Sequence, residues 1–129
     1  MAIRGVSKVV IGVADQQRAM DFWVKTLGFT VTTDAAYGED GERWIEVTAP
    51  DGNTVLILSL DREGRFKADG QQGRPNSNFF FYADDIERTY AELSKGVEFP
   101  AKPEKQPWGW WSMFTDSEGN RFALQQREG

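Results

Sequence analysis

The 129-residue chain contains no cysteine and no histidine. Without cysteine it can form neither a disulfide nor a thiolate metal site, and it has no thiol nucleophile. Without histidine it lacks the commonest metal ligand and the commonest general base near neutral pH, so a Ser-His-Asp triad is also excluded. The chemistry of the chain must therefore come from carboxylates, amines, amides and aromatic rings.

Long apolar runs and an excess of basic residues are missing as well. No run of about 18 apolar residues is present, so no membrane span is expected, and the N-terminal residues lack the apolar segment of a signal peptide. Lys and Arg number 15 against 20 Asp and Glu, and the net charge of −5 argues against nucleic-acid binding. These properties predict a cytoplasmic single-domain protein with a core large enough to fold unaided.

The first half of the chain has the pattern of a strand, a helix and three more strands. Apolar residues alternate in KVVIGV, as in a strand with one buried face. Three- and four-residue apolar steps then predict a helix, with Asp15 as N-cap and Gly28 at its end. The turn signals YGEDGE and PDGN separate strands that we expect at residues 29–34, 43–49 and 54–60.

The same order of elements begins again after a polar, glycine-bearing stretch at residues 61–76, which is read as a linker or covering loop. We expect strands at 78–85, 97–100, 110–116 and 121–126, with a helix capped by Asp85 after the first. Sliding the chain by about 70 residues aligns Asp15 with Asp85, and a slide of 67 aligns Trp44 with Trp111. The sequence therefore predicts two βαβββ modules, at about 5–60 and 77–126.

Two segments carry a family resemblance. KVVIGVAD…AMDFWVKTLGF resembles the opening of the vicinal oxygen chelate superfamily, the glyoxalase, bleomycin resistance protein and extradiol dioxygenase group. FTDSEGNRFALQ resembles its closing strand pair, and together the motifs cover nearly the whole chain. The resemblance implies an α+β fold of two tandem βαβββ modules whose curled mixed sheets enclose a cavity, commonly in a homodimer.

Enzymes of this superfamily hold a divalent metal through His, Glu or Gln side chains on the first and last strands of each module. The resemblance carries the four ligand positions onto Lys8, Leu56, Asn78 and Ala123. An ammonium, two apolar side chains and one amide do not make a site for Zn²⁺, Ni²⁺, Fe²⁺ or Mn²⁺. We therefore expect no metal and no cofactor, which disfavours the metal-dependent lyase and dioxygenase activities.

Alternation along the strands then predicts which side chains face the cavity, if those four positions do. The set expected to bind a ligand is Trp44, Glu46, Trp111, Met113, Phe80, Tyr82, Trp108, Lys8, Asn78 and Arg121. Val10, Gly12, Thr48, Thr54, Leu58, Leu60, Thr115 and Gln125 share this side. The helix side is expected to hold Val9, Ile11, Val13, Ile45, Val47, Val55, Ile57, Phe79, Phe81, Ser112, Phe114, Phe122 and Leu124.

Several aromatic and charged residues have more than one interpretation. Trp44 and Trp111 should face one another across the cavity, whereas Trp23 is expected in the core. Trp110 has the opposite parity and is expected in the core or at a dimer contact, and Trp108 either forms a pocket wall or clamps a loop. Glu46 can pair with a ligand cation, with Lys8 or with Arg121. The turn residues Gly52, Asn53, Gly119 and Asn120 are expected to need positive φ.

The favoured function is metal-independent binding of an apolar or aromatic small molecule, with a weak preference for a cation. Sequestration of a drug or metabolite, as in bleomycin resistance, would need no catalysis. One alternative is a metal-free lyase or isomerase using Glu46 or Lys8 as acid or base. A second is a non-catalytic assembly protein whose dimer depends on Trp108 or Trp110.

Overall fold

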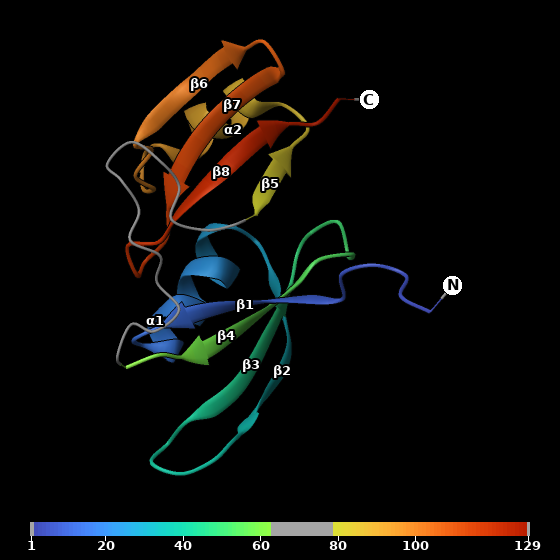
Figure 1. Ribbon diagram of the computed structural model, residues 1–129. Coiled ribbons are helices and arrows are strands. Elements are labelled where there is room, and N and C mark those ends of the chain that lie inside the picture. The colour runs from blue at the N-terminus through green and yellow to red at the C-terminus, as the bar shows by residue number, and fades with distance from the viewer. Residues whose placement is uncertain (1, 63–78, 129) are drawn as a thin grey trace. The chain divides into compact units, whose positions relative to one another are not determined.

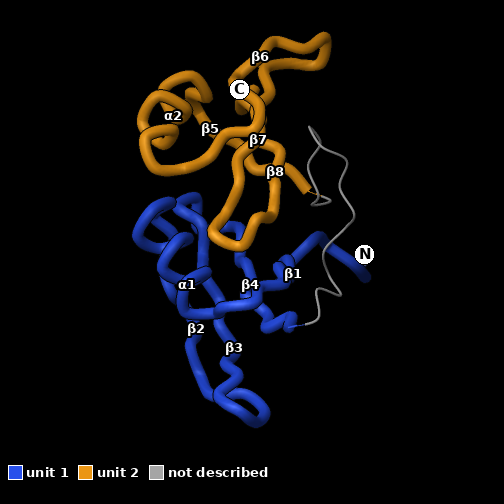
Figure 2. Tube along the Cα trace, turned by 90° about the vertical axis from the view of Figure 1, so that its left-hand side faces the viewer, with its two compact units in different colours: residues 1–66 blue, residues 67–129 orange. Residues whose placement is uncertain are grey.

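The computed structural model describes residues 2–62 and 79–128, and most of the predicted linker, together with Asn78, lies outside them (Figure 1). The chain forms two compact units, residues 1–66 and 67–129 (Figure 2). Each unit contains one helical region and a four-stranded mixed sheet. This is an α+β fold built from two βαβββ modules.

The first unit has the sheet order β1-β4-β3-β2. Its elements are β1 (Lys8–Val13), α1 (Gln16–Asp21), η1 (Phe22–Thr26), β2 (Thr30–Ala36), β3 (Arg43–Thr48) and β4 (Val55–Leu60). β1 is parallel to β4, and the other neighbours are antiparallel. A parallel pair needs a long crossover, and the helix with β2 and β3 supplies it.

The second unit repeats this arrangement with the order β5-β8-β7-β6. Its elements are β5 (Phe80–Ala83), α2 (Ile86–Leu93), β6 (Ala101–Gln106), β7 (Gly109–Thr115) and β8 (Arg121–Gln126). The strand predicted at 97–100 is wrong, because the second strand of this module begins at Ala101. Val97 N still donates to Leu93 O at 2.8 Å, so these residues close the helix before pairing begins.

The predicted helix caps are confirmed in both modules. The carboxylate of Asp15 accepts a hydrogen bond from Arg18 N at 3.0 Å, and that of Asp85 accepts one from Arg88 N at 3.1 Å. Each side chain satisfies one of the backbone donors that a helix leaves free at its first turn. The equivalent caps start the two helices in the same way.

The first helical segment departs from the predicted regular helix after Asp21. η1 is π-helical, and Leu27 N donates to Phe22 O, five residues earlier, at 3.2 Å. Trp23 is fully buried within it and packs on Phe29 with ring centroids 5.1 Å apart, which confirms its predicted place in the core. Gly28 follows with φ of +79°, the left-handed conformation expected of a helix end.

The face that β4 turns towards α1 is the opposite of the predicted one. Arg43 of β3 donates to Gln17 of α1 at 2.9 Å, which places Arg43, Ile45 and Val47 on the helix side. Val47 pairs with Leu56, and opposed residues of paired strands point to the same face. Leu56, Leu58 and Leu60 therefore lie on the helix side, and Val55 and Ile57 lie on the face of Lys8 and Glu46.

The cause is a difference of one residue between the two equivalent turns. The β3–β4 turn is closed by Ala49 N donating to Thr54 O at 2.8 Å, and the β7–β8 turn by Asp116 N donating to Asn120 O at 2.9 Å. Four residues separate Ala49 from Thr54, whereas three separate Asp116 from Asn120. When the two modules are aligned, β4 is therefore shifted by one residue relative to β8. A one-residue shift moves every side chain of a strand to the other face.

The shorter turn is organised by the carboxylate of Asp116. It accepts hydrogen bonds from Glu118 N, from Asn120 N and from Asn120 Nδ2, at 2.9, 2.9 and 3.1 Å. Burial nevertheless raises the pKa of this carboxyl above its usual value. Gly52 and Gly119 have the predicted positive φ, of 79° and 80°. The same prediction for Asn53 and Asn120 is wrong, because neither adopts positive φ.

Phenylalanine fills the helix side of the second sheet, as predicted. Phe81 meets Phe114 and Phe122 with ring centroids 5.6 and 5.3 Å apart. Phe99 joins this cluster to α2, because its ring lies 6.3 Å from that of Phe114 and 5.0 Å from that of Tyr90. Edge-to-face and tilted contacts of this kind are the favoured geometry for aromatic pairs.

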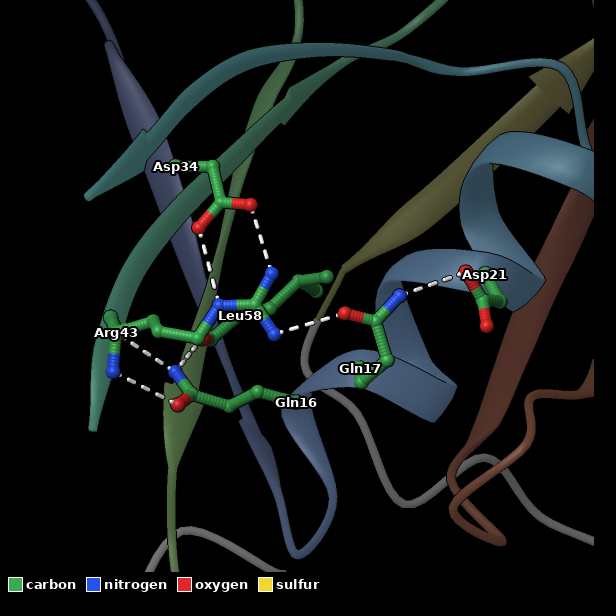
Figure 3. Close-up of polar contacts among 6 residues, drawn as sticks. All are labelled: Gln16, Gln17, Asp21, Asp34, Arg43 and Leu58. Carbon is green, nitrogen blue, oxygen red and sulfur yellow. Dashed lines mark hydrogen bonds and ion pairs between the residues drawn. The ribbon is translucent and has the colours of Figure 1, made fainter. Parts of the chain in front are cut away.

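Gln16 joins α1 to the first sheet through backbone atoms alone (Figure 3). Its Nε2 donates to the carbonyls of Arg43 and Leu58 at 2.6 and 2.8 Å, and its Oε1 accepts from Arg43 N at 3.0 Å. The side chain is buried, with the residue 6% exposed. Its neighbour Gln17 instead contacts the side chains of Arg43 and Asp21 at the surface.

Replacing Gln16 with Ala should lower the free energy of unfolding by about 1–3 kcal/mol, because buried backbone groups would lose their partners. The matched change Gln17→Ala should cost less than about 0.5 kcal/mol, since its contacts are exposed. Urea unfolding followed by circular dichroism measures both. Equal losses in the two variants would contradict the special role of Gln16.

Candidate functional site

Lys8, Glu46 and Trp44 form a polar cluster on the face of the first sheet opposite α1. Trp44 and Glu46 lie two residues apart on β3, and the indole Nε1 donates to Glu46 Oε2 at 2.8 Å. Lys8 Nζ lies 2.9 Å from the same oxygen. Lys8 belongs to β1, so its side chain spans the intervening β4, a distance of roughly 10 Å between strand axes.

Two further contacts hold this cluster in place. The ring of Tyr37, just beyond β2, meets that of Trp44 at 5.1 Å and 62° between planes. Thr32 lies where the β2–β3 register shifts, and its hydroxyl donates to Glu46 O at 3.3 Å and shares a hydrogen bond with Thr48 Oγ1 at 3.0 Å. Tyr37 was not predicted, because it lies within the acidic turn signal rather than in a strand.

The electrostatics of the cluster favour an ionised Glu46. The hydrogen bond from the Trp44 indole, followed by that from Lys8, lowers the pKa of Glu46 below its usual value, although burial opposes this effect. Lys8, in the same unit, is the counter-ion of this carboxylate. Of the partners predicted for Glu46, the pair with Lys8 is confirmed.

The second sheet carries an aromatic face on the side away from α2. Tyr82 of β5 and Trp111 of β7 flank Gln125 of β8, and in the next row Phe80 and Met113 flank Ala123. Phe80, Trp108 and Tyr82 are 56%, 51% and 45% exposed. The aromatic face is defined here as Phe80, Tyr82, Trp108 and Trp111.

Trp108 and Arg127, which both lie outside the strands, contact the rings of β5 on this face. Trp108, in the turn between β6 and β7, meets Phe80 of the edge strand β5 with centroids 6.3 Å apart. Arg127 places its guanidinium 5.1 Å from the Tyr82 ring centre, and its Nη1 lies 3.8 Å from Asp84 Oδ1. Arg127 was missed because it follows the last strand. It lies two residues after Gln125, so strand alternation would place both side chains on the same face.

The remaining predicted residues are placed as follows. Met113 and Ala123 are fully buried, so they belong to the packed interior, while Trp111 and Arg121 are partly buried. Leu56 faces α1 rather than the predicted side. Trp44 and Trp111 belong to different units, and their opposition across a cavity stays a prediction. Over residues 2–62 and 79–128, no three acidic side chains gather as a metal site would require.

The family follows from comparison with known proteins. Residues 5–124 match the model of the Glyoxalase/Bleomycin resistance protein/Dioxygenase superfamily. The chain belongs to this superfamily. In the part of the chain that the structure describes, no helix has the length and apolarity needed to cross a bilayer.

Individual relatives match along almost their whole length. TnmS3, an antibiotic binding protein from Streptomyces sp. CB03234, is 31% identical with a TM-score of 0.77, and the match covers 99% of both chains. A superfamily member from Sphaerobacter thermophilus DSM 20745 is 33% identical with a TM-score of 0.79, covering 98% of this chain and 100% of the other. The uncharacterized protein YetH of Bacillus subtilis is 30% identical over 96% of this chain and 99% of its own.

The lowered pKa of Glu46 predicts a stability contribution that acid removes. Because the folded-state pKa lies below the ordinary value of 4.5, the contribution is complete above about that pH and is lost as the pH falls through the folded-state pKa. The difference in unfolding free energy between the wild type and Glu46→Gln should therefore shrink from neutral pH to about pH 3. Urea titrations at several pH values measure this difference.

Trp44→Phe provides the control for this prediction, because it removes the largest cause of the shift and keeps Lys8. In that background the pH dependence of the Glu46→Gln effect should weaken. A constant difference between wild type and Glu46→Gln over the whole pH range would contradict the assignment.

Proposed function

We propose that this protein binds an apolar or aromatic small molecule without a metal and acts by sequestering it. The observation that carries the proposal is the aromatic face, where Phe80, Tyr82 and Trp108 are about half exposed. Apolar surface left in water is unfavourable by about 25 cal/mol for each Å², so a ligand that covers these rings gains that free energy. Stacking on each ring adds about 0.5–1.5 kcal/mol.

The comparisons support a binding role of this kind. TnmS3 is an antibiotic binding protein, and it matches this chain over 99% of both lengths. Binding by stacking and exclusion of water requires no catalytic group, which suits a chain without histidine or cysteine. The resemblance to the superfamily further predicts a homodimer, and a cytoplasmic location is expected.

Each unit, taken by itself, offers residues that are proposed to contact a ligand. The second unit offers the aromatic face and Arg121, and the first offers Trp44, Glu46 and Lys8. Met113 is proposed to support this surface from within, because it is fully buried. Asn78 was predicted in this set and lies outside the described residues.

A catalytic role for Glu46 or Lys8 is less well supported. A general base works best when its pKa lies near the working pH, whereas the Trp44 and Lys8 hydrogen bonds lower the pKa of Glu46. Lys8 in turn is held in an ion pair by that carboxylate. The pair is suited to recognition rather than to proton transfer.

Calorimetric titration with a panel of neutral and cationic planar aromatic compounds, with and without EDTA, tests the proposal. Saturable binding is expected, and EDTA should not change it. Phe80→Ala and Trp108→Ala should each weaken binding by about tenfold, which corresponds to about 1.4 kcal/mol. Tryptophan emission gives an independent readout in the Phe80 variant.

Trp110→Phe is the matched control, because Trp110 neighbours Trp111 on β7 and has the opposite parity. It should leave the affinity unchanged. Absence of binding across the panel would refute sequestration of an aromatic compound, and binding abolished by EDTA would refute its independence of metal.

A further inference from the structure

The two carboxylate oxygens of Glu46 differ in the number of hydrogen bonds that they accept. Oε2 accepts both the Trp44 indole hydrogen and a hydrogen from Lys8. Within residues 2–62 and 79–128, Oε1 accepts no hydrogen bond. A carboxylate has about four acceptor positions, so acceptor capacity is left over. The Glu46 side chain is 11% exposed, which leaves part of it accessible.

Lys8 has hydrogen-bond donors that Glu46 does not use. Its ammonium carries three hydrogens, and one of them points to Glu46 Oε2 at 2.9 Å. The Lys8 side chain is 44% exposed. A hydrogen-bond donor and an acceptor are thus held side by side by the ion pair between them. Their charges compensate each other, so the pair as a whole does not select a charged ligand.

The ring of Trp44 lies next to this pair in a fixed orientation. Its N–H is bound by Glu46, and the Tyr37 ring packs against it. A side chain that is already ordered loses little entropy when a ligand stacks on it, which favours binding. The cluster therefore combines a rigid aromatic surface with a polar edge.

We propose that Lys8 and Glu46 form a donor–acceptor subsite that binds the edge of a neutral planar ring compound carrying an N–H beside a carbonyl, as in a ring lactam. The ligand N–H donates to Glu46 Oε1, and its carbonyl accepts from Lys8 Nζ. This inference rests on the proposed binding function and names the class of ligand. It replaces the preference for a cationic ligand that Glu46 alone suggested from the sequence.

Selectivity should follow from the cost of leaving these groups unpaired. A site built to hydrogen-bond a donor rejects an analogue without it, because its own polar groups then lose water and gain no partner. Hydrogen bonds to charged groups contribute about 1.5–3 kcal/mol, so removal of the ligand donor should weaken binding by about 10- to 100-fold.

The test compares 2-quinolone, which has a ring N–H beside its carbonyl, with N-methyl-2-quinolone, which lacks the donor. Calorimetry on the full chain should show 2-quinolone binding at least about tenfold more tightly. In Glu46→Leu the ratio of the two affinities should fall to about one, because the acceptor is gone. In Lys8→Met both quinolones should bind more weakly than in the wild type, since both present a carbonyl.

Gln17→Ala serves as the control, because Gln17 lies on α1, on the other side of the sheet from the cluster, and its contacts are with Asp21 and Arg43. It should keep the wild-type ratio. Circular dichroism checks folding, and Lys8→Met keeps the test decisive if Glu46→Leu does not fold. Equal affinity of the wild type for the two quinolones would overturn the subsite.

Two other outcomes separate this inference from the proposed function. If other planar compounds of the panel bind and neither quinolone does, the subsite is refuted and sequestration stands. The same holds if the 1-methylquinolinium cation binds more tightly than 2-quinolone. If no planar compound of any kind binds, the proposed function itself fails.

Discussion

The pairing of Val47 with Leu56 determines what each face of the first sheet can do. It places Leu56, Leu58 and Leu60 of β4 against the helix and leaves Lys8, Trp44 and Glu46 together on the opposite face. A shift of one residue would exchange the two faces of β4 and put Leu56 beneath the ion pair. The register of the backbone pairing therefore decides which side chains share a face with the polar cluster.

The two modules share an order of elements but present different surfaces. The first sheet bears a compensated ion pair and an anchored indole, and the second bears half-exposed rings and a guanidinium over Tyr82. One fold thus supplies a directional polar contact and a broad apolar one. In small-molecule sites generally, a few polar contacts of the first kind orient the ligand, and apolar surfaces of the second kind contribute most of the affinity.

Much of this architecture could be predicted from the sequence because it depends on local signals. Asp15 and Asp85 cap their helices through bonds to residues three positions on, and the phenylalanine face of the second sheet follows from simple alternation. The register of β4 could not be predicted in this way. The aligned turns look alike in sequence, yet the carboxylate of Asp116 tightens one of them, and Ala49 has no equivalent group.

The candidate site was predicted in part for the same reason. Trp44 and Glu46 lie two residues apart on one strand, so alternation predicts that they share a face. Tyr37 contacts Trp44 from a turn, and a turn has no periodic pattern from which this contact could be predicted. The π-helical turn at Phe22–Thr26, which contains the buried Trp23, was also missed, because apolar steps of three and four residues predict a helix and do not separate a π turn from an α turn.

Gln16 has a consequence for how such a protein can diverge. Its amide forms its hydrogen bonds with backbone atoms of Arg43 and Leu58. Side chains on the face of β3 away from α1, such as Trp44 and Glu46, can therefore be exchanged without removing these hydrogen bonds. The attachment of the helix and the chemistry of the opposite face thus depend on different atoms of the same strand.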